Sequence, residues 1–185
     1  MTPEDDEQAI LRVHTEWWES CRGSDIPRMS RCFPSGHGYL MFNLNTHPYF
    51  GIDEKIRLWE HYKGQIDKPV FADIRIMRME LARDMAWIAT EGLFPERQVG
   101  PEGRGSALRP IDPDRVIDFI RVRSTEVYRR DDGEGRPLWR IWHLHASLLC
   151  PEDEKRPAFG DTSRERGLGG NPWGPARRVA GLTRS

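Results

Sequence analysis

The sequence predicts an α+β protein in which N-terminal helices cover one face of a curved, mainly antiparallel sheet. Residues 3–21 and a segment from Gly51 onwards carry apolar side chains at helical spacing. Four longer segments between residues 70 and 149 are strand candidates. The last two flank the turn residues Asp131-Asp132-Gly133, so they predict a long terminal β-hairpin.

The first helix is expected to run to about Cys21. Thr2 can cap it, Pro3 suits its first turn, and the acidic residues that follow complement the positive end of the helix dipole. One stripe is apolar apart from a histidine, and its members are Ile10, His14, Trp17 and Cys21, with Leu11 and Trp18 beside it. This face should cover the sheet.

Gly23-Ser24-Asp25 should end this helix and start a short one over residues 26–33, with Asp25 as its cap. A strand over 39–44 and a turn at 45–48 follow. In the third helix, the expected buried stripe consists of Ile56, Trp59 and Lys63, flanked by Leu58 and Tyr62.

Strands are predicted over residues 70–81, 85–94, 116–130 and 138–149. The loop 95–115, rich in proline and glycine, is interpreted as a lid or as a disordered segment. We expect one domain over residues 1–150 and an extended Gly/Pro-rich tail over 151–185, which is solvated rather than a second domain.

The bulk composition excludes several classes of protein. The 185 residues carry a formal charge of −1, which does not favour nucleic acid or an anionic membrane as partner. Three cysteines without a Cys-x-x-Cys pair argue against a disulfide framework and a structural zinc site. The acidic N-terminus lacks the blocks of a signal peptide, and no apolar run is long enough to span a membrane, so a cytoplasmic protein is expected.

The register of the terminal hairpin decides which side chains face the helices. Pairing symmetrically about residue 134 places Glu126 opposite Trp142 and Ser124 opposite Leu144, on a mainly apolar face. The other, polar face pairs Thr125 with His143 and Arg123 with His145. The apolar face should point towards the helices, although a single bulge would exchange the two faces.

Glu126 is the sharpest catalytic candidate. A carboxylate among Trp142, Ser124 and Leu144 would be partly desolvated, which would raise its pKa as a general base or acid requires. The alternative is a carboxylate near the rim of the cone, paired with Arg140 or Arg129.

His143 and His145 lie two residues apart and therefore on one face of their strand. They suit general acid or base catalysis, or two metal-ligand positions. The alternative is a hydrogen-bonding pair at a subunit interface, beside Arg123. No further Asp, Glu or Cys stands at suitable spacing, so no metal is expected.

Aromatic residues are the natural lining of an apolar pocket, although packing in the core is equally open for each of them. They are Trp17, Trp18, Tyr39, Trp59 and Trp142. Thr90 joins this lining if Ala86 and Ile88 point inward, and Glu91 then lies outside with Trp87 and the histidines.

Several motifs occur in a specific order along residues 7–147. They are Gly23-Ser24-Asp25 after the first helix, Gly51-Ile52-Asp53 before the third, Asp84 to Ala89 opening a strand, and Val127 to Gly133 followed by Trp139, His143, His145 and Ser147. In this order the chain resembles the nuclear transport factor 2-like superfamily, particularly its SnoaL-like members and the association domain of calmodulin-dependent kinase. The resemblance implies a cone with a pocket between helices and concave sheet, and often a dimer on the outer sheet face.

The sequence departs from these relatives at two places. Where the kinase-association relatives read Thr-Arg-Val-Trp, this chain has Thr125-Glu126-Val127-Tyr128, so an acidic residue replaces a basic pocket residue. Asp25 stands where dehydrochlorinase and dehydratase relatives carry the aspartate of an Asp-His dyad, but no histidine lies near residues 71–73. That dyad is therefore expected to be absent, with Asp25 serving as a helix cap.

Two functions are open at this point. The first is a cofactor-independent isomerase, dehydratase or cyclase that binds a small apolar molecule. Glu126 would move the proton, Tyr39 or Ser124 would hydrogen-bond a developing oxyanion, and the tryptophans would orient the substrate. The second is a non-catalytic ligand-binding or assembly domain that forms a homodimer through Trp87, His143, His145 and Arg123.

Overall fold

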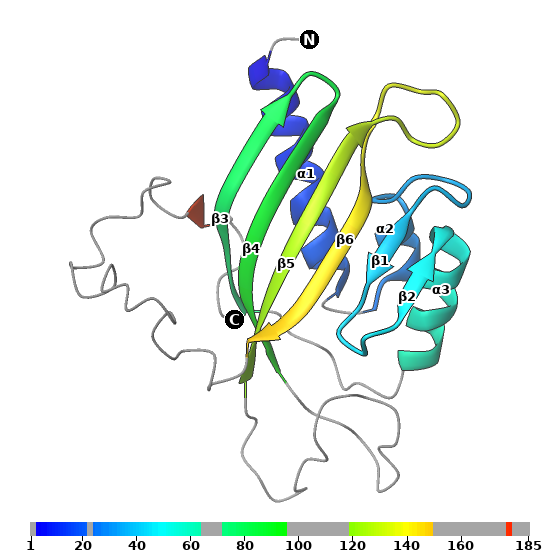
Figure 1. The fold of residues 1–185 in the computed structure, drawn as a ribbon, viewed down its shortest axis with the longest axis vertical. Helices are drawn as coiled ribbons and strands as arrows, with labels where there is room; N and C mark the ends of the chain where they lie inside the picture. Colours follow the sequence, from blue (N-terminus) through cyan, green and yellow to red (C-terminus); the bar gives the residue numbers. More distant parts are fainter. Residues whose placement is uncertain (1–2, 22–23, 64–71, 96–118, 150–176, 179–185) are drawn as a thin grey trace, which may run out of the picture.

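A computed structural model describes residues 3–21, 24–63, 72–95, 119–149 and 177–178. In these ranges the helices lie on one side of a curved sheet (Figure 1). The elements in chain order are α1 (Pro3–Cys21), α2 (Ile26–Ser30), β1 (Leu40–Phe42), β2 (Pro48–Phe50), α3 (Gly51–Tyr62), β3 (Ala72–Ala82), β4 (Met85–Pro95), β5 (Phe119–Arg130), β6 (Trp139–Leu149) and β7 (Arg177–Arg178).

The described strands form one sheet in the order β2-β1-β6-β5-β4-β3-β7. All neighbouring pairs are antiparallel except β1 and β6, which run parallel. The predicted α+β class, with helices on a curved and mainly antiparallel sheet, is confirmed.

The observed elements differ from the predicted ones at their ends. The short α2 stops at Ser30 rather than at residue 33, and β1 is shorter than the predicted strand over 39–44. The strands β2 and β7 were not predicted. The predicted loop 95–115 and the tail 151–185 lie almost wholly outside the described residues, as does the proposed cap Thr2. No helix in the described ranges is long and apolar enough to cross a membrane.

Helix α1 packs its predicted stripe against the sheet. Ile10, Trp17 and Cys21 are buried, and His14 is fully buried with them. The start of the helix is tied to the β5–β6 hairpin through Asp6, which forms an ion pair with Arg130 and accepts a hydrogen bond from Trp139 Nε1 at 3.0 Å. These contacts fix the position of α1 along the strands.

Helix α3 buries a different face from the one that the apolar pattern predicts. The buried residues are Gly51, Lys55 and Leu58, whereas Ile56 and Trp59 are only partly buried and Lys63 is exposed. The expected stripe was wrong because it treated Lys55 as a solvated residue, as lysines usually are. Here rings from α1, from the segment after α2 and from α3 itself surround its amine.

The register of the β5–β6 hairpin also differs from the symmetric one. Arg130 pairs with Trp139 at the closed end, which shifts the pairing by one residue. Further along the hairpin, Tyr128 pairs with Ile141 but Val127 pairs with His143, so Trp142 is an extra residue that forms a bulge. The bulge shifts the strand pairing by one more residue. Beyond the bulge the two shifts add to an even number, so residues from His143 onwards keep their predicted faces; before it, Trp139 and Ile141 are buried.

Glu126 therefore lies opposite Leu144, not Trp142, and Ser124 lies opposite Ala146. Both side chains still face the helices, because Val122, Ser124 and Glu126 are buried in alternation with exposed neighbours.

Two glycines in the turn of this hairpin have the same left-handed backbone but different surroundings, so alanine at each position should have a different cost. Gly133 (φ 86°) lies against the backbone of Ser35, and a Cβ there would come within 2.5 Å of the Ser35 carbonyl oxygen; Gly135 (φ 85°) has no atom within 4 Å of such a Cβ. Gly135→Ala should cost about 1 kcal/mol from backbone strain alone. Gly133→Ala should cost about 1–3 kcal/mol more, because the backbone of Ser35 must move.

Urea unfolding of both variants measures this difference in the free energy of unfolding. Equal losses for the two variants would show that the turn does not pack against Ser35.

Candidate active site

Glu126 stands at the centre of the buried polar groups between α1 and the sheet. Both the carboxylate and His14 are fully buried, and His14 Nδ1 lies 2.7 Å from Glu126 Oε2. Four neighbours contact this carboxylate, namely His14, Trp18 (Nε1 donating at 3.0 Å), Ser124 (hydroxyl donating at 3.4 Å) and Tyr128 (hydroxyl donating). The carboxylate accepts hydrogen bonds on both oxygens.

The spacing of these residues along their elements explains the arrangement. His14 and Trp18 are four residues apart on α1, so they project from one face of the helix. Ser124 and Tyr128 lie two residues on either side of Glu126 on β5, so all three share one face of the strand. The site forms where the inner face of β5 meets this face of α1.

Hydrogen-bond donors surround the carboxyl group of Glu126. An indole N–H can only donate, so Trp18 is a donor to this group. Burial, followed by the negative charge of Glu126, raises the pKa of Tyr128 well above its usual value, so its hydroxyl keeps the proton that it donates.

His14 presents its second ring nitrogen without a partner. When Nδ1–H donates to Glu126, the neutral form of the ring has its lone pair on Nε2. Nε2 is buried and, within the described part of the chain, makes no hydrogen bond. Thr90 Oγ1 and Trp17 Nε1 are buried in the same unpaired state. A buried unpaired polar atom costs about 1–3 kcal/mol, which suits atoms kept for a ligand.

A second polar centre surrounds the amine of Lys55 on α3. Nζ hydrogen-bonds to the Tyr39 hydroxyl at 3.1 Å and contacts Met41 Sδ at 3.3 Å. Aromatic rings enclose it, with centroids at 4.3 Å (Trp17), 4.4 Å (Phe33), 5.3 Å (Tyr39) and 5.9 Å (Trp59). We refer to these four rings as the lysine cage. Burial lowers the pKa of Lys55 to about 7.

The cysteines near these centres are held as thiols. Cys21 and Cys32 are buried and free. Burial raises the pKa of Cys32 to about 12 and that of Cys21 further. Since the thiolate is the nucleophilic form, neither side chain is a nucleophile at neutral pH.

The predicted inner residues divide between these two centres. Trp18 and Ser124 contact Glu126, and Thr90 lies opposite Ser124 on the neighbouring strand β4. Trp17, Tyr39 and Trp59 instead belong to the lysine cage. Burial, aided by the charge of Glu126, raises the pKa of Tyr39 well above its usual value.

Trp142 is the predicted lining residue that the structure places elsewhere. As the bulge residue of β6 it donates its indole N–H to the Asp131 carbonyl at 2.7 Å, and the Arg129 guanidinium lies 4.3 Å from its ring centroid. It is thus not a neighbour of Glu126.

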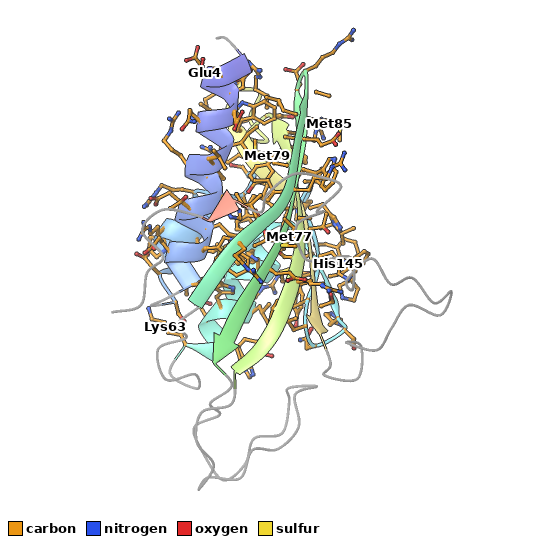
Figure 2. The ribbon with its side chains drawn as sticks, turned by 90° about the vertical axis from the view of Figure 1, so that its left-hand side faces the viewer. Glu4, Lys63, Met77, Met79, Met85 and His145 are labelled. Atoms are coloured by element: carbon orange, nitrogen blue, oxygen red, sulfur yellow. The ribbon has the colours of Figure 1, made fainter. Side chains whose placement is uncertain are left out.

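The residues predicted for the outer face do lie there. Figure 2 shows His145 on the side of the sheet away from α1. His143 Nδ1 donates to the Leu40 carbonyl at 3.0 Å, and burial lowers its pKa. Arg123 donates to Glu91 at 2.8 Å, so these two form an ion pair.

Sequence reasoning missed three residues of the site. His14 was visible as the polar exception on an apolar helix stripe, and Tyr128 shares the alternation of Glu126. Lys55 lies four residues before Trp59, but nothing in the sequence distinguishes it from a solvated lysine. Asp25 is a helix cap, as predicted, and accepts from the Arg28 backbone N–H at 3.0 Å. Among the described residues, no three His, Cys, Asp or Glu side chains gather as metal ligands do.

Comparisons with known proteins find similarity at the level of structure. No family model matches the sequence, and no curated protein matches it significantly. The structure is similar to an NTF2-like protein of unknown function from Pseudomonas putida, with 21% identity, a TM-score of 0.58, and coverage of 84% of this chain and 95% of that one.

Two further solved structures are named after enzymes. One is a putative dehydratase of the NTF2-like family from Streptomyces avermitilis (16% identity, 80% of this chain and 99% of that one, TM-score 0.57). The other is a ketosteroid isomerase-like protein from Erwinia carotovora atroseptica (13% identity, 78% and 96%, TM-score 0.58). At these identities the likeness shows a shared fold.

Substituting each of two adjacent tryptophans tests the hydrogen bond that Trp18 donates to Glu126. Trp17 and Trp18 are both buried on α1, but only Trp18 donates its indole N–H to Glu126. Trp18→Phe should lower the free energy of unfolding by about 1–2 kcal/mol more than Trp17→Phe, because it leaves a buried carboxylate oxygen with one donor fewer. Thermal and urea unfolding of the two variants measure the difference; equal losses would contradict the role given to this hydrogen bond.

Proposed function

On the premise that the chain has the nuclear transport factor 2-like fold, we propose that it is a cofactor-independent enzyme acting by proton transfer on a small apolar molecule. The reaction classes are isomerisation, dehydration and ring closure. The observation that carries the proposal is the buried pair of His14 and Glu126 with an unpaired Nε2.

The geometry favours His14 over Glu126 as the group that moves the proton. Both oxygens of Glu126 are already engaged by donors, whereas Nε2 of His14 has no hydrogen-bond partner among the described residues. A carboxylate bound to Nδ1–H fixes the tautomer of the ring and stabilises the imidazolium that forms when Nε2 takes a proton. In the proposed reaction His14 is therefore the base, and Glu126 is the positioning residue.

The surroundings support the same chemistry. Burial excludes bulk water, which strengthens each electrostatic interaction with a developing charge. The buried hydroxyl of Thr90 lacks a partner in the described residues and is a candidate donor to a substrate oxygen. The putative dehydratase and the isomerase-like protein among the structural neighbours have names that fit this kind of reaction.

Hydrogen exchange on a carbonyl compound tests the proposal. The probes are 2-tetralone and cyclohex-3-enone in D₂O, with loss of the α-proton signals followed by NMR. The wild-type protein should accelerate exchange, and His14→Gln should reduce the acceleration by about 100-fold or more, since Gln cannot take the proton. Glu126→Gln should also reduce it, because the neutral amide stabilises the imidazolium less.

The matched control is His47→Gln, which changes an exposed histidine in the turn before β2 and should leave the rate unchanged. Unaltered exchange in His14→Gln, or no acceleration by the wild-type protein with either probe, would contradict the proposal.

A second candidate function, self-assembly, is favoured by an aromatic patch on the outer sheet face. Phe42 on β1 is 44% exposed and makes edge contacts with His143 and His145, with ring centroids 5.4 and 5.7 Å away. An exposed aromatic side chain flanked by imidazoles on a sheet face suits a symmetric homodimer contact.

Sedimentation velocity tests this second candidate. Phe42→Ala and His145→Ala should each weaken dimerisation by about tenfold or more if the patch is the interface. Leu138→Ala removes another exposed apolar side chain, just before β6 at the hairpin turn, and serves as the control. A wild-type protein that stays monomeric at high micromolar concentration would rule the candidate out.

A further inference from the structure

The amine of Lys55 is an unusual group to find in the interior. The side chain is fully buried in the middle of α3, and its Nζ contacts only the Tyr39 hydroxyl, Met41 Sδ and the rings of the cage in the described part of the chain. A buried ammonium is normally paired with a carboxylate. Here no carboxylate hydrogen-bonds to it among the described residues.

The lysine cage has two properties that matter for chemistry. Its ring faces attract a cation and therefore stabilise the charged amine without a counter-ion. Its walls are otherwise apolar, and Trp17, Phe33 and Tyr39 are buried whereas Trp59 is only partly so. A small molecule would therefore reach the amine most easily past Trp59, where the fewest packed atoms must move.

Both protonation states of the amine are within reach at neutral pH. Burial lowers the pKa of Lys55 to about 7, although Cys21, Cys32 and Glu126 act in the opposite direction. An exposed lysine has a pKa near 10.4, so only about one amine in a thousand is neutral at pH 7. A neutral, desolvated amine is a nucleophile towards carbonyl carbon.

We propose that Lys55 is a covalent carbonyl-binding residue, whose Nζ forms an imine with an apolar aldehyde or ketone inside the lysine cage. The lone pair of Nζ adds to the carbonyl carbon and gives a carbinolamine. The carbonyl oxygen then leaves as water with the two hydrogens that the neutral amine carried, and a C=N bond replaces the C=O bond. No electrons are gained or lost.

Tyr39 is placed to assist the loss of water. Its hydroxyl lies 3.1 Å from Nζ and its pKa is raised well above the usual value by burial, so it remains a proton donor near the departing oxygen. The protonated imine is again a cation, and the same four ring faces would stabilise it as they do the ammonium. This site goes beyond the proton transfer proposed for His14, because it involves a different side chain and holds whether or not that reaction occurs.

Reductive trapping tests the inference directly. The full chain is incubated at pH 7.5 with benzaldehyde and sodium cyanoborohydride, which reduces an imine to a stable benzylamine. The sequence has only four lysines, Lys55, Lys63, Lys68 and Lys155. Intact-mass spectrometry should show one benzyl group per chain, and peptide mapping should place it on Lys55, at least about tenfold faster than on the exposed Lys63.

The pH dependence and three variants sharpen the result. Labelling of Lys55 should rise as the pH increases through about 7 and then level off. Lys55→Met should abolish the fast label and Lys63→Met should not. Tyr39→Phe should slow labelling of Lys55 severalfold without moving the label elsewhere.

Peptide mapping of the wild-type protein decides the question even if a Lys55 variant does not fold. Labels spread evenly over the lysines, or absent from Lys55, would overturn the inference. Benzoate is the alternative probe: if it quenches tryptophan fluorescence at low concentration while benzaldehyde gives no adduct, Lys55 binds anions as a plain cation and the inference is wrong. Failure of trapping with intact ketone exchange would leave the His14 proposal standing.

Discussion

The hydrogen bonds to the Glu126 carboxylate connect α1 to the inner face of the sheet. They join α1 to β5 across more than a hundred residues of sequence, through His14 and Trp18. A buried carboxylate is unfavourable unless its oxygens are satisfied, so the position and rotation of α1 are constrained by this requirement. Near the N-terminus of α1, Asp6 also connects the helix to the sheet, because it hydrogen-bonds to Arg130 and Trp139 at a less buried position.

The interior contains two polar centres, and adjacent tryptophans connect them. Trp18 bonds to Glu126, Trp17 lies over the Lys55 amine, and the two ring centroids are 6.0 Å apart. The negative and positive groups of this interior are thus separated by aromatic rings rather than joined in an ion pair.

The sequence predicts the class of the fold and the inward direction of Glu126, because these follow from alternation and helical spacing. It does not predict which donors meet the carboxylate, since the rotation of α1 over the sheet depends on contacts distant in sequence. Lys55 was missed for a related reason: its burial depends on rings from three separate segments, and a lysine in isolation indicates solvent. Trp142 was misplaced because a bulge cannot be recognised from alternation alone.

The bulge at Trp142 has a consequence for how this hairpin can change over evolutionary time. The turn shifts the strand pairing by one residue and the bulge shifts it by one more, so the two together place Leu144 opposite Glu126 with both side chains facing inward. Loss of either alone would invert the remainder of β6 and turn Leu144 out to solvent. A single insertion or deletion in the turn is therefore expected to be destabilising unless a compensating change in the bulge restores the register.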